Sequence, residues 1–282
     1  MLTLALQLSR CVLVGVVCLC AIWAAAEQTA AQSAPPVLID DLNQATTGTR
    51  PHLLTQVGEH FYYVADSVGR GAELWRFDER TGATVLVSGV RNETIAEPDL
   101  LTDLGDALLF VNTPGPAVIG GYSDTLFRAN LDGAERIHSA GFTIEHPTSY
   151  RNLCSLATHK DIAFFAGDDN AVTLTDRTGT EPWRSDGTAA GTFLLRDIAP
   201  GIDSSQPSAF FDLGEVMVFF ATSPTAGREL WRSDGTSDGT LLVADTVPGP
   251  DSDEKWPLAH LDDKLLFTVS APDRETLWVS DG

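Results

Sequence analysis

The sequence predicts an all-β fold, a β-propeller of about five four-stranded blades. The first observation is a repeated segment, which runs from Glu229 to Asp245 and recurs closely at residues 181–197 and more loosely at 73–78 and 276–282. The second is its period, since copies aligned on the central aromatic residue are separated by 52, 56, 48 and 47 residues. The third is that helical periodicity and helix-length segments are both lacking. A period of about 40 to 50 residues with several short strands is typical of propeller blades.

The expected repeats cover most of the chain. They span roughly residues 51–96, 97–146, 147–206, 207–256 and 257–282, and their aligned aromatic residues are Trp75, Phe127, Trp183, Trp231 and Trp278. One large ring per repeat is expected to fill the wedge between neighbouring blades.

The first repeat illustrates the four strands, called A to D, that each blade should contain. Short β-branched or aromatic runs predict strands at residues 53–57, 61–65, 73–77 and 84–87, with a tight A–B turn at Gly58. In each later repeat the second strand is a continuous apolar run, which predicts a strand buried on both faces.

The connection from strand C to strand D carries the sequence Ser-Asp-Gly-Thr at residues 185–188 and 233–236. An aspartate that caps its own turn, followed by a glycine at positive φ, explains this pattern without any catalytic role. We therefore interpret the repeated aspartates as structural.

Residues 37–41 resemble a D strand without its own A, B and C strands, whereas the last repeat stops after strand C. The two ends complement each other, so we expect residues 37–41 to complete the last blade and close the ring. Closure would remove two exposed sheet edges. The alternative is that the chain is a piece of a longer array.

An apolar stretch at residues 11–26, preceded by Arg10 and followed by small residues, predicts a signal peptide over residues 1–31. A retained membrane anchor is the alternative. Residues 32–282 then form a single repeat domain in the secreted or cell-envelope (extracellular or periplasmic) compartment. Of the four cysteines, only Cys154 remains after cleavage, and its apolar surroundings favour a buried, inert thiol.

The chain is strongly acidic, with a formal net charge of -21. This charge disfavours nucleic acid and anionic membrane surfaces as partners. After signal cleavage we expect no membrane association.

The pattern Glu-Leu-Trp-x-Ser-Asp-Gly-Thr, followed by Gly-Thr, Leu-Val-x-Asp and Pro-Gly, resembles the ELWxxDGT repeat of exported bacterial proteins that are also called hyalin-like. The match is close at residues 181–201 and 229–249, partial at 73–87 and 275–282, and poor in the second repeat. The resemblance implies an extracellular propeller-like scaffold and no established catalytic residue.

Binding is expected at the end of the blades that carries the B–C and D–A connections, because these loops vary in length on a fixed scaffold. The B–C loops are residues 112–123, 167–180 and 222–227. The D–A loops at 200–205 and 248–254 alternate oxygen donors that suit calcium, although solvated turn carboxylates explain them better and no complete EF-hand loop is present.

No catalytic, cofactor or metal residue is assigned, because the six histidines, the serines and the glycines show no enzyme motif. The sequence favours a non-catalytic secreted scaffold that binds an extracellular polymer, glycan or protein. One alternative is a propeller glycoside hydrolase that uses carboxylates in the central channel, since such pairs come from distant positions. Another is a calcium-stabilised structural repeat protein of the cell envelope.

Overall fold

A computed structural model describes residues 50–67, 71–88, 96–114, 124–144, 156–168, 178–250, 254–271 and 274–282. The predicted signal peptide, the expected closing strand at 37–41 and Cys154 lie outside the described residues. Within them every regular element is a strand, as the repeat pattern predicts, and no helix is long and apolar enough to cross a membrane.

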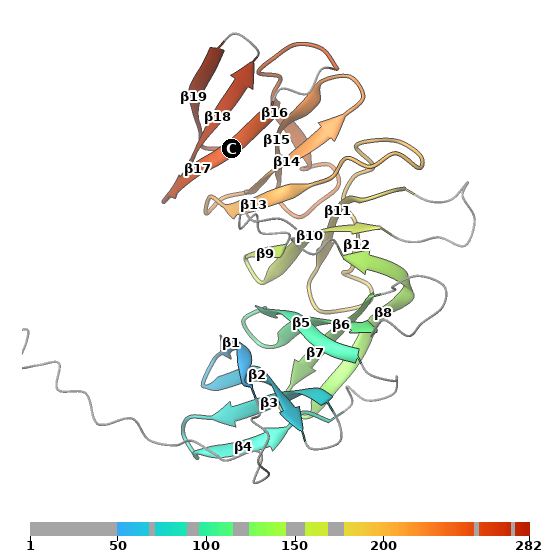
Figure 1. Ribbon diagram of the computed structural model, residues 1–282, viewed down its shortest axis with the longest axis vertical. Helices are drawn as coiled ribbons and strands as arrows, with labels where there is room; N and C mark the ends of the chain where they lie inside the picture. Colours follow the sequence, from blue (N-terminus) through green and yellow to red (C-terminus); the bar gives the residue numbers. More distant parts are fainter. Residues whose placement is uncertain are drawn as a thin grey trace, which may run out of the picture. The chain divides into compact units, whose positions relative to one another are not determined.

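The strands follow one another from the blue to the red end of the chain in Figure 1. They are β1 (His52–Val57), β2 (His60–Ser67), β3 (Gly71–Asp78), β4 (Ala83–Leu86), β5 (Ala96–Asp103), β6 (Leu108–Pro114), β7 (Asp124–Asn130), β8 (Gly133–Ile144), β9 (Leu156–His159), β10 (Ile162–Asp168), β11 (Glu181–Ser185), β12 (Phe193–Leu194), β13 (Ser208–Asp212), β14 (Met217–Ser223), β15 (Gly227–Ser233), β16 (Leu241–Ala244), β17 (Glu254–Leu261), β18 (Lys264–Ala271) and β19 (Arg274–Ser280).

These strands form antiparallel meanders, one per repeat. The first and fourth repeats are four-stranded sheets, β1–β4 and β13–β16, and the fifth contributes the three strands β17–β19. The second and third repeats depart from the expectation of separate blades. The long strand β8 extends past its own repeat, so that Thr143 and Ile144 pair with Asp168 and Gly167 of β10 and join both repeats in one eight-stranded sheet.

Strand A carries a bulge that the sequence analysis did not predict. Two residues after each of three prolines stands a non-glycine residue at positive φ, and the A–B register shifts at the same place. These residues are Leu53 (φ 54°), Leu100 (φ 51°) and Ala209 (φ 57°). An extra residue in one strand increases the local twist, so the first, second and fourth repeats begin with the same bend.

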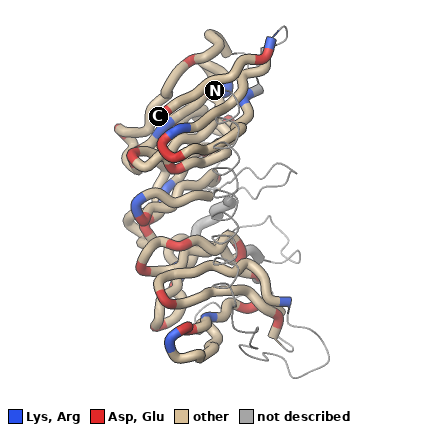
Figure 2. Tube along the Cα trace, turned by 90° about the vertical axis from the view of Figure 1, so that its left-hand side faces the viewer, with Lys and Arg blue, Asp and Glu red and all other residues tan. Residues whose placement is uncertain are grey.

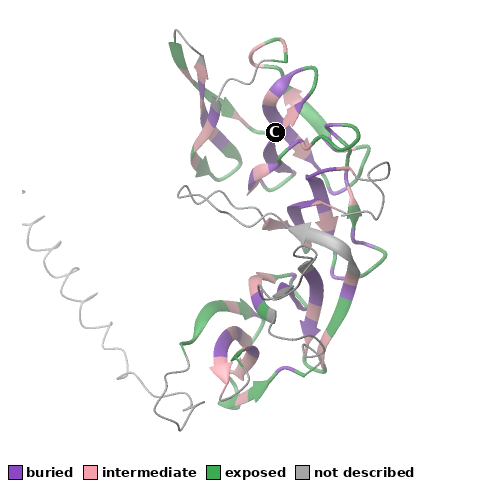
Figure 3. Cartoon of the chain, turned by 45° about the vertical axis from the view of Figure 1, so that its right-hand side comes forward, coloured by how far each residue is buried: buried purple, intermediate pink, exposed green. Residues whose placement is uncertain are grey.

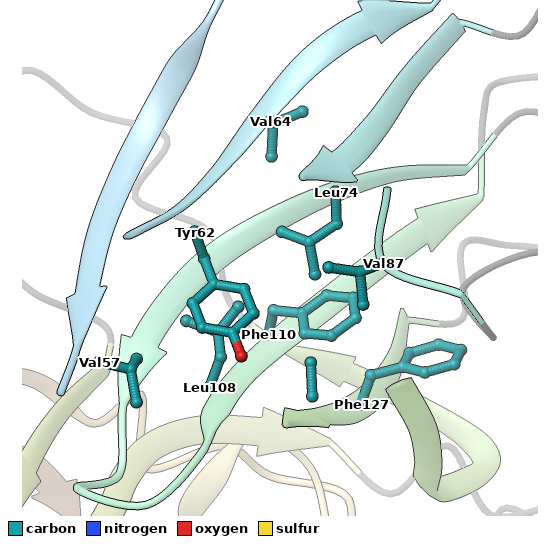
Figure 4. Close-up of a cluster of buried hydrophobic side chains, with 9 residues drawn as sticks. Val57, Tyr62, Val64, Leu74, Val87, Leu108, Phe110 and Phe127 are labelled. Atoms are coloured by element: carbon teal, nitrogen blue, oxygen red, sulfur yellow. The ribbon is translucent and has the colours of Figure 1, made fainter. Parts of the chain in front are cut away.

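The core is divided into clusters that each lie between two successive repeats. In β14, Met217 and Phe219 pack on the third repeat, whereas Val218 and Phe220 pack on the fifth. Figure 3 shows such buried positions along the middle strands, and Figure 4 shows the cluster between the first and second repeats, in which Tyr62 meets Phe110. The second strand is thus buried on both faces in β6, β10 and β14, as its apolar sequence predicts. In β18 the prediction holds for one face only, because Leu265, Phe267 and Val269 are buried while the alternate residues are partly exposed.

The repeated tryptophan also packs between successive repeats in the middle of the chain. Trp183 lies in the cluster of the second and third repeats and Trp231 in that of the third and fourth, and each is 7% exposed. Trp278 of the last repeat is 39% exposed. The expected wedge role is therefore confirmed for Trp183 and Trp231.

Candidate functional site

Each meander has two ends, which we call the tight-turn end and the loop end. The tight-turn end carries the A–B and C–D connections, and the loop end carries the B–C and D–A connections. Charged residues lie both in these connections and within the strands (Figure 2). The loop end was the predicted binding region, but residues 115–123, 169–177 and 251–253 lie outside the described residues.

At the tight-turn end, the repeated aspartate closes its own turn. One carboxylate oxygen of Asp234 accepts hydrogen bonds from the backbone N–H of Thr236 at 2.9 Å and from its hydroxyl at 2.7 Å. The hydrogen bond from the Thr236 side chain is the main cause that lowers the pKa of Asp234. Asp186 makes the same two bonds to Thr188 at 3.0 and 2.7 Å. The expected capping of its own turn by the repeated aspartate is therefore observed in both copies.

The same turn explains why each copy contains a second glycine. A Cβ on Gly191 would overlap the carboxylate of Asp186, and a Cβ on Gly239 would overlap that of Asp234. The first glycine has positive φ, 81° at Gly187, where side chains are disfavoured. The whole turn is thus held by its own sequence.

An arginine bonds the C–D segment of the second, fourth and fifth repeats to the preceding repeat. The guanidinium that follows the tryptophan donates to a backbone carbonyl in the next repeat's C–D segment. The three bonds are Arg76 to Asn130 at 3.1 Å, Arg184 to Gly235 at 3.2 Å and Arg232 to Gly282 at 2.9 Å. The sequence analysis missed this contact, although an arginine follows the aromatic residue in four repeats and Val279 replaces it in the fifth.

The glutamate two residues before the tryptophan is also part of the scaffold. Glu181 is fully buried and accepts four hydrogen bonds from the D–A loop that follows it. Glu229, 1% exposed, forms an ion pair with Lys255 at the start of β17. The recurrence of this glutamate in the sequence was the available signal, but its partners lie in a different segment.

The described part of the predicted calcium loop is occupied by internal bonds. The hydroxyl of Ser204 accepts the backbone N–H of Thr180 at 2.9 Å, and Ser205 donates to Glu181 at 2.6 Å. Asp203 is exposed. Among the described residues, no group of three or more histidine, cysteine, aspartate or glutamate side chains is arranged to hold a metal ion.

One histidine and aspartate lie close together at the tight-turn end. Nδ1 of His159 is 2.7 Å from Oδ1 of Asp212, and the same oxygen accepts the backbone N–H of Gly214 at 2.7 Å. His159 is 3% exposed. The Asp212 side chain is 42% exposed, so the pair links a buried histidine of the third repeat to a partly exposed aspartate of the fourth.

Comparison with known proteins shows no family. The sequence matches no protein-family model. A 4-hydroxy-tetrahydrodipicolinate synthase of Xylella fastidiosa (strain Temecula1 / ATCC 700964) is 30% identical over 122 residues, which are 41% of this chain and 38% of that protein. The chain therefore spans well under half of this relative.

Several solved structures show a distant likeness. A puromycin-hydrolyzing peptidase of Mycobacterium tuberculosis aligns over 79% of this chain and 34% of its own, with a TM-score of 0.47 and 11% identity. An acylaminoacyl peptidase of Pyrococcus horikoshii aligns over 86% of this chain and 40% of its own, with a TM-score of 0.43 and 9% identity. The β-propeller domain of the Trilobed protease from Pyrococcus furiosus aligns over 84% of both chains, with a TM-score of 0.35 and 14% identity. Likenesses this distant transfer no activity to this chain.

Proposed function

We propose that this protein is a non-catalytic, exported scaffold that binds an extracellular polymer, glycan or protein at its loop end. The observation that supports the proposal is that the repeated polar side chains bond within the protein. The aspartate, arginine and glutamate of the repeat bond to the protein itself, as Asp234, Arg232 and Glu229 do. Repetition is then accounted for by architecture, and variation between repeats remains concentrated in the loops.

Two exposed positions at the loop end allow a direct test. Ile202, 66% exposed, lies in the D–A loop at 198–205, and Thr225 is exposed in the B–C loop at 222–227. The double variant Ile202→Arg and Thr225→Arg should reduce binding of residues 32–282 to a glycan array or to extracellular proteins at least about tenfold. The matched control adds two arginines at the tight-turn end, at the exposed residues Ser237 and Asp238, and should bind normally.

The same preparation separates the alternatives. Equal loss of binding in both double variants would reject the loop end as the site. Release of reducing sugar from a polysaccharide by the wild-type protein would favour the hydrolase instead. A thermal midpoint that rises in millimolar calcium relative to EDTA would favour the calcium-stabilised repeat protein, because a ligand of the native state raises apparent stability.

We further propose that the five repeats form a closed propeller, in which residues 37–41 pair with the free edge of β19. In the complete repeats strand D pairs with strand C at the tryptophan, as Leu86 does with Trp75 and Leu242 with Trp231. Trp278 of β19 has β18 on one side, and the described residues provide no strand on the other. The connection lengths support the proposal, since Asp40 precedes Pro51 by 11 residues, compared with 10 from Asp197 to Pro207 and 12 from Asp245 to Pro257.

The two terminal sheets also each have a face with apolar residues that are exposed or only partly buried. In β2, Tyr62 and Val64 pack on the second repeat, so the alternate residues Phe61 and Tyr63 belong to the opposite face of the sheet. Trp75 and Phe77 of β3 share that face, and all four aromatic residues are only partly buried. In the last repeat, Leu277 is 65% exposed and Val279 61% exposed. Packing these two faces together would cover apolar surface at both ends of the array.

A matched pair of substitutions tests the closing strand. Leu38 aligns with Val87 and Leu195, which are 6% and 1% exposed, whereas Ile39 aligns with the exposed Arg196. Leu38→Asp should therefore lower the free energy of unfolding by about 2 to 4 kcal/mol, and Ile39→Asp by much less. Equal effects of the two substitutions in urea unfolding would reject the pairing.

A further inference from the structure

One arginine at the loop end belongs to a single repeat. The position three residues before the aligned aromatic residue lies within one residue of the start of strand C, and only the fourth repeat has a basic residue there. The five residues at this position are Ala72, Asp124, Thr180, Arg228 and Glu275. The shared architecture of the repeats therefore does not require an arginine, whereas binding groups are expected at positions that vary on a fixed scaffold.

Neighbouring strands hold the side chain of Arg228 in place. Its Nη2 donates to the Ser208 hydroxyl at 2.6 Å, and its Nη1 donates to the Gln206 carbonyl at 3.4 Å. The guanidinium carbon lies 5.7 Å from the centroid of the Phe220 ring, which is fully buried. The group is thus positioned before any ligand arrives, and this preorganisation lowers the entropy cost of binding.

The partners of Arg228 are all neutral. Within the part of the chain that the structure describes, no carboxylate forms an ion pair with it. By contrast, Arg128 pairs with Asp106 at 2.8 Å, and Arg184 pairs with Asp186 at 3.1 Å. Burial lowers the pKa of Arg228, and no neighbouring charge opposes that shift. Arg228 is therefore a partly buried cation whose charge is not balanced by the described residues.

The donors of Arg228 that remain suit an oxyanion. A guanidinium has five N–H donors in a fixed fork, and the bonds to Ser208 and Gln206 leave three. No acceptor among the described residues engages Nε, and the protein does not enclose this atom. Two adjacent N–H groups of a guanidinium match the two oxygens of a carboxylate, and the resulting charge-assisted hydrogen bonds are strong.

The surroundings of Arg228 restrict the class of anion. The formal net charge of -21 repels densely charged polymers, and salt limits this repulsion to about 8 Å at physiological ionic strength. Next to Arg228 lie the exposed residues Gln206 and Thr225, whose side chains can bond to sugar hydroxyl groups. A single carboxylate on an otherwise neutral glycan therefore fits this site better than a sulfated polymer.

We propose that Arg228 is the anchor of a carboxylate subsite at the loop end, which takes a uronic acid residue of an extracellular glycan. The carboxylate accepts hydrogen bonds from Nε and from an unused N–H of the guanidinium, while Ser208 and the Phe220 ring keep the guanidinium in place. The inference rests on the proposed function and narrows its ligand to a glycan with spaced carboxylates.

Two sugars that differ only at one carbon test the subsite. Methyl glucuronide carries a carboxylate where methyl glucoside carries a hydroxymethyl group. Nitrogen-15 NMR of the Arg228 Nε–H, assigned with the variant Arg228→Lys, follows the binding of each sugar to the wild-type protein. We expect the resonance to shift with methyl glucuronide, with an affinity at least about tenfold higher than for methyl glucoside.

Two substitutions show whether the preference for the carboxylate comes from this arginine. In Arg228→Gln, binding followed at the backbone amides of Ser208 and Thr225 should be equally weak for both sugars. Arg196→Gln is the matched control, because Arg196 also donates to a carbonyl, that of Thr240 at 2.9 Å, and lies 5.9 Å from the ring of Trp231. It removes the same charge at the C–D connection of the fourth repeat and should keep the preference.

Three results would overturn the subsite. The first is an Arg228 Nε–H resonance that does not shift with methyl glucuronide, and this result decides even if Arg228→Gln does not fold. The second is equal affinity of the wild-type protein for the two sugars. The third is an affinity for acetate as high as that for methyl glucuronide, which would show a site for small free anions instead of a sugar.

The proposed function fails or stands separately. Because arginines at the loop end would attract an acidic glycan, the loop-end variant for this test is Ile202→Asp with Thr225→Asp. If this variant loses binding to a glycan array but the Arg228 resonance does not respond to methyl glucuronide, the loop end binds a ligand and the carboxylate subsite is wrong. If the resonance responds but the variant binds the array as the wild type does, the subsite stands and the loop end is rejected as the polymer site.

Discussion

The buried ion pair between Glu229 and Lys255 should contribute strongly to the integrity of the fourth and fifth repeats. The ammonium nitrogen is 2.9 Å from the carboxylate, and the two side chains are 0% and 1% exposed. At that distance the Coulomb attraction is about 6 kcal/mol for an effective dielectric constant of ~20. Lys255→Met removes the attraction and leaves Glu229 as an uncompensated buried charge. We expect the free energy of unfolding to fall by about 3 to 5 kcal/mol.

Equilibrium urea unfolding at pH 7 measures this loss, and a thermal melt should show a decrease on the order of 10 °C. The double variant Glu229→Leu with Lys255→Met is the control, because it replaces both charges by apolar groups. It should unfold with a free energy within about 1 kcal/mol of the wild type or higher. A loss below about 1 kcal/mol in Lys255→Met alone would refute the reasoning, since it would mean that water or a rearranged side chain compensates Glu229.

Three further predictions follow from the repeat contacts. Gly239→Ala should lower the free energy of unfolding in urea by about 1 to 3 kcal/mol, because the added Cβ would overlap the Asp234 carboxylate. The same substitution should lower it less when Asp234 is also replaced by alanine. Arg184→Met should cost about 1 to 2 kcal/mol, because it removes the bond to the next repeat's turn and the contact with the Phe193 ring at 5.2 Å. Burial raises the pKa of Glu181 from 4.5 to about 7, so folding takes up a proton between these values and stability falls as the pH rises through that window. The difference in the free energy of unfolding between the wild type and Glu181→Gln should change by about 3 kcal/mol between pH 4.5 and 8. A difference that stays constant over this range would contradict the raised pKa.

Features that depend on nearby residues could be predicted from the sequence. The turn at Asp234 is formed by residues within a few positions of one another, so its chemistry is readable from Ser-Asp-Gly-Thr alone. The continuous apolar run at 217–220 likewise predicted a strand that is buried on both faces. The repeat period then predicted how often these elements recur.

The bulge in strand A was not predictable in this way. Leu53 and Ala209 adopt positive φ, which residues with a Cβ rarely do. No glycine in the residues next to them indicates this conformation. The register between two strands decides where the extra residue is accommodated, and that register is a property of the sheet.

The sequence by itself determined the all-β repeat pattern, its period, the C–D turns and which residues recur. Only the tertiary structure decided what the recurring side chains contact. Arg184 donates to the Gly235 carbonyl, 51 positions away. The equivalent glutamates have different partners, since Glu181 bonds to Ser205 and Glu229 pairs with Lys255. The physical reason is that each contact joins segments that lie far apart in the sequence, so the partner of each side chain depends on how strands and loops pack in the folded chain.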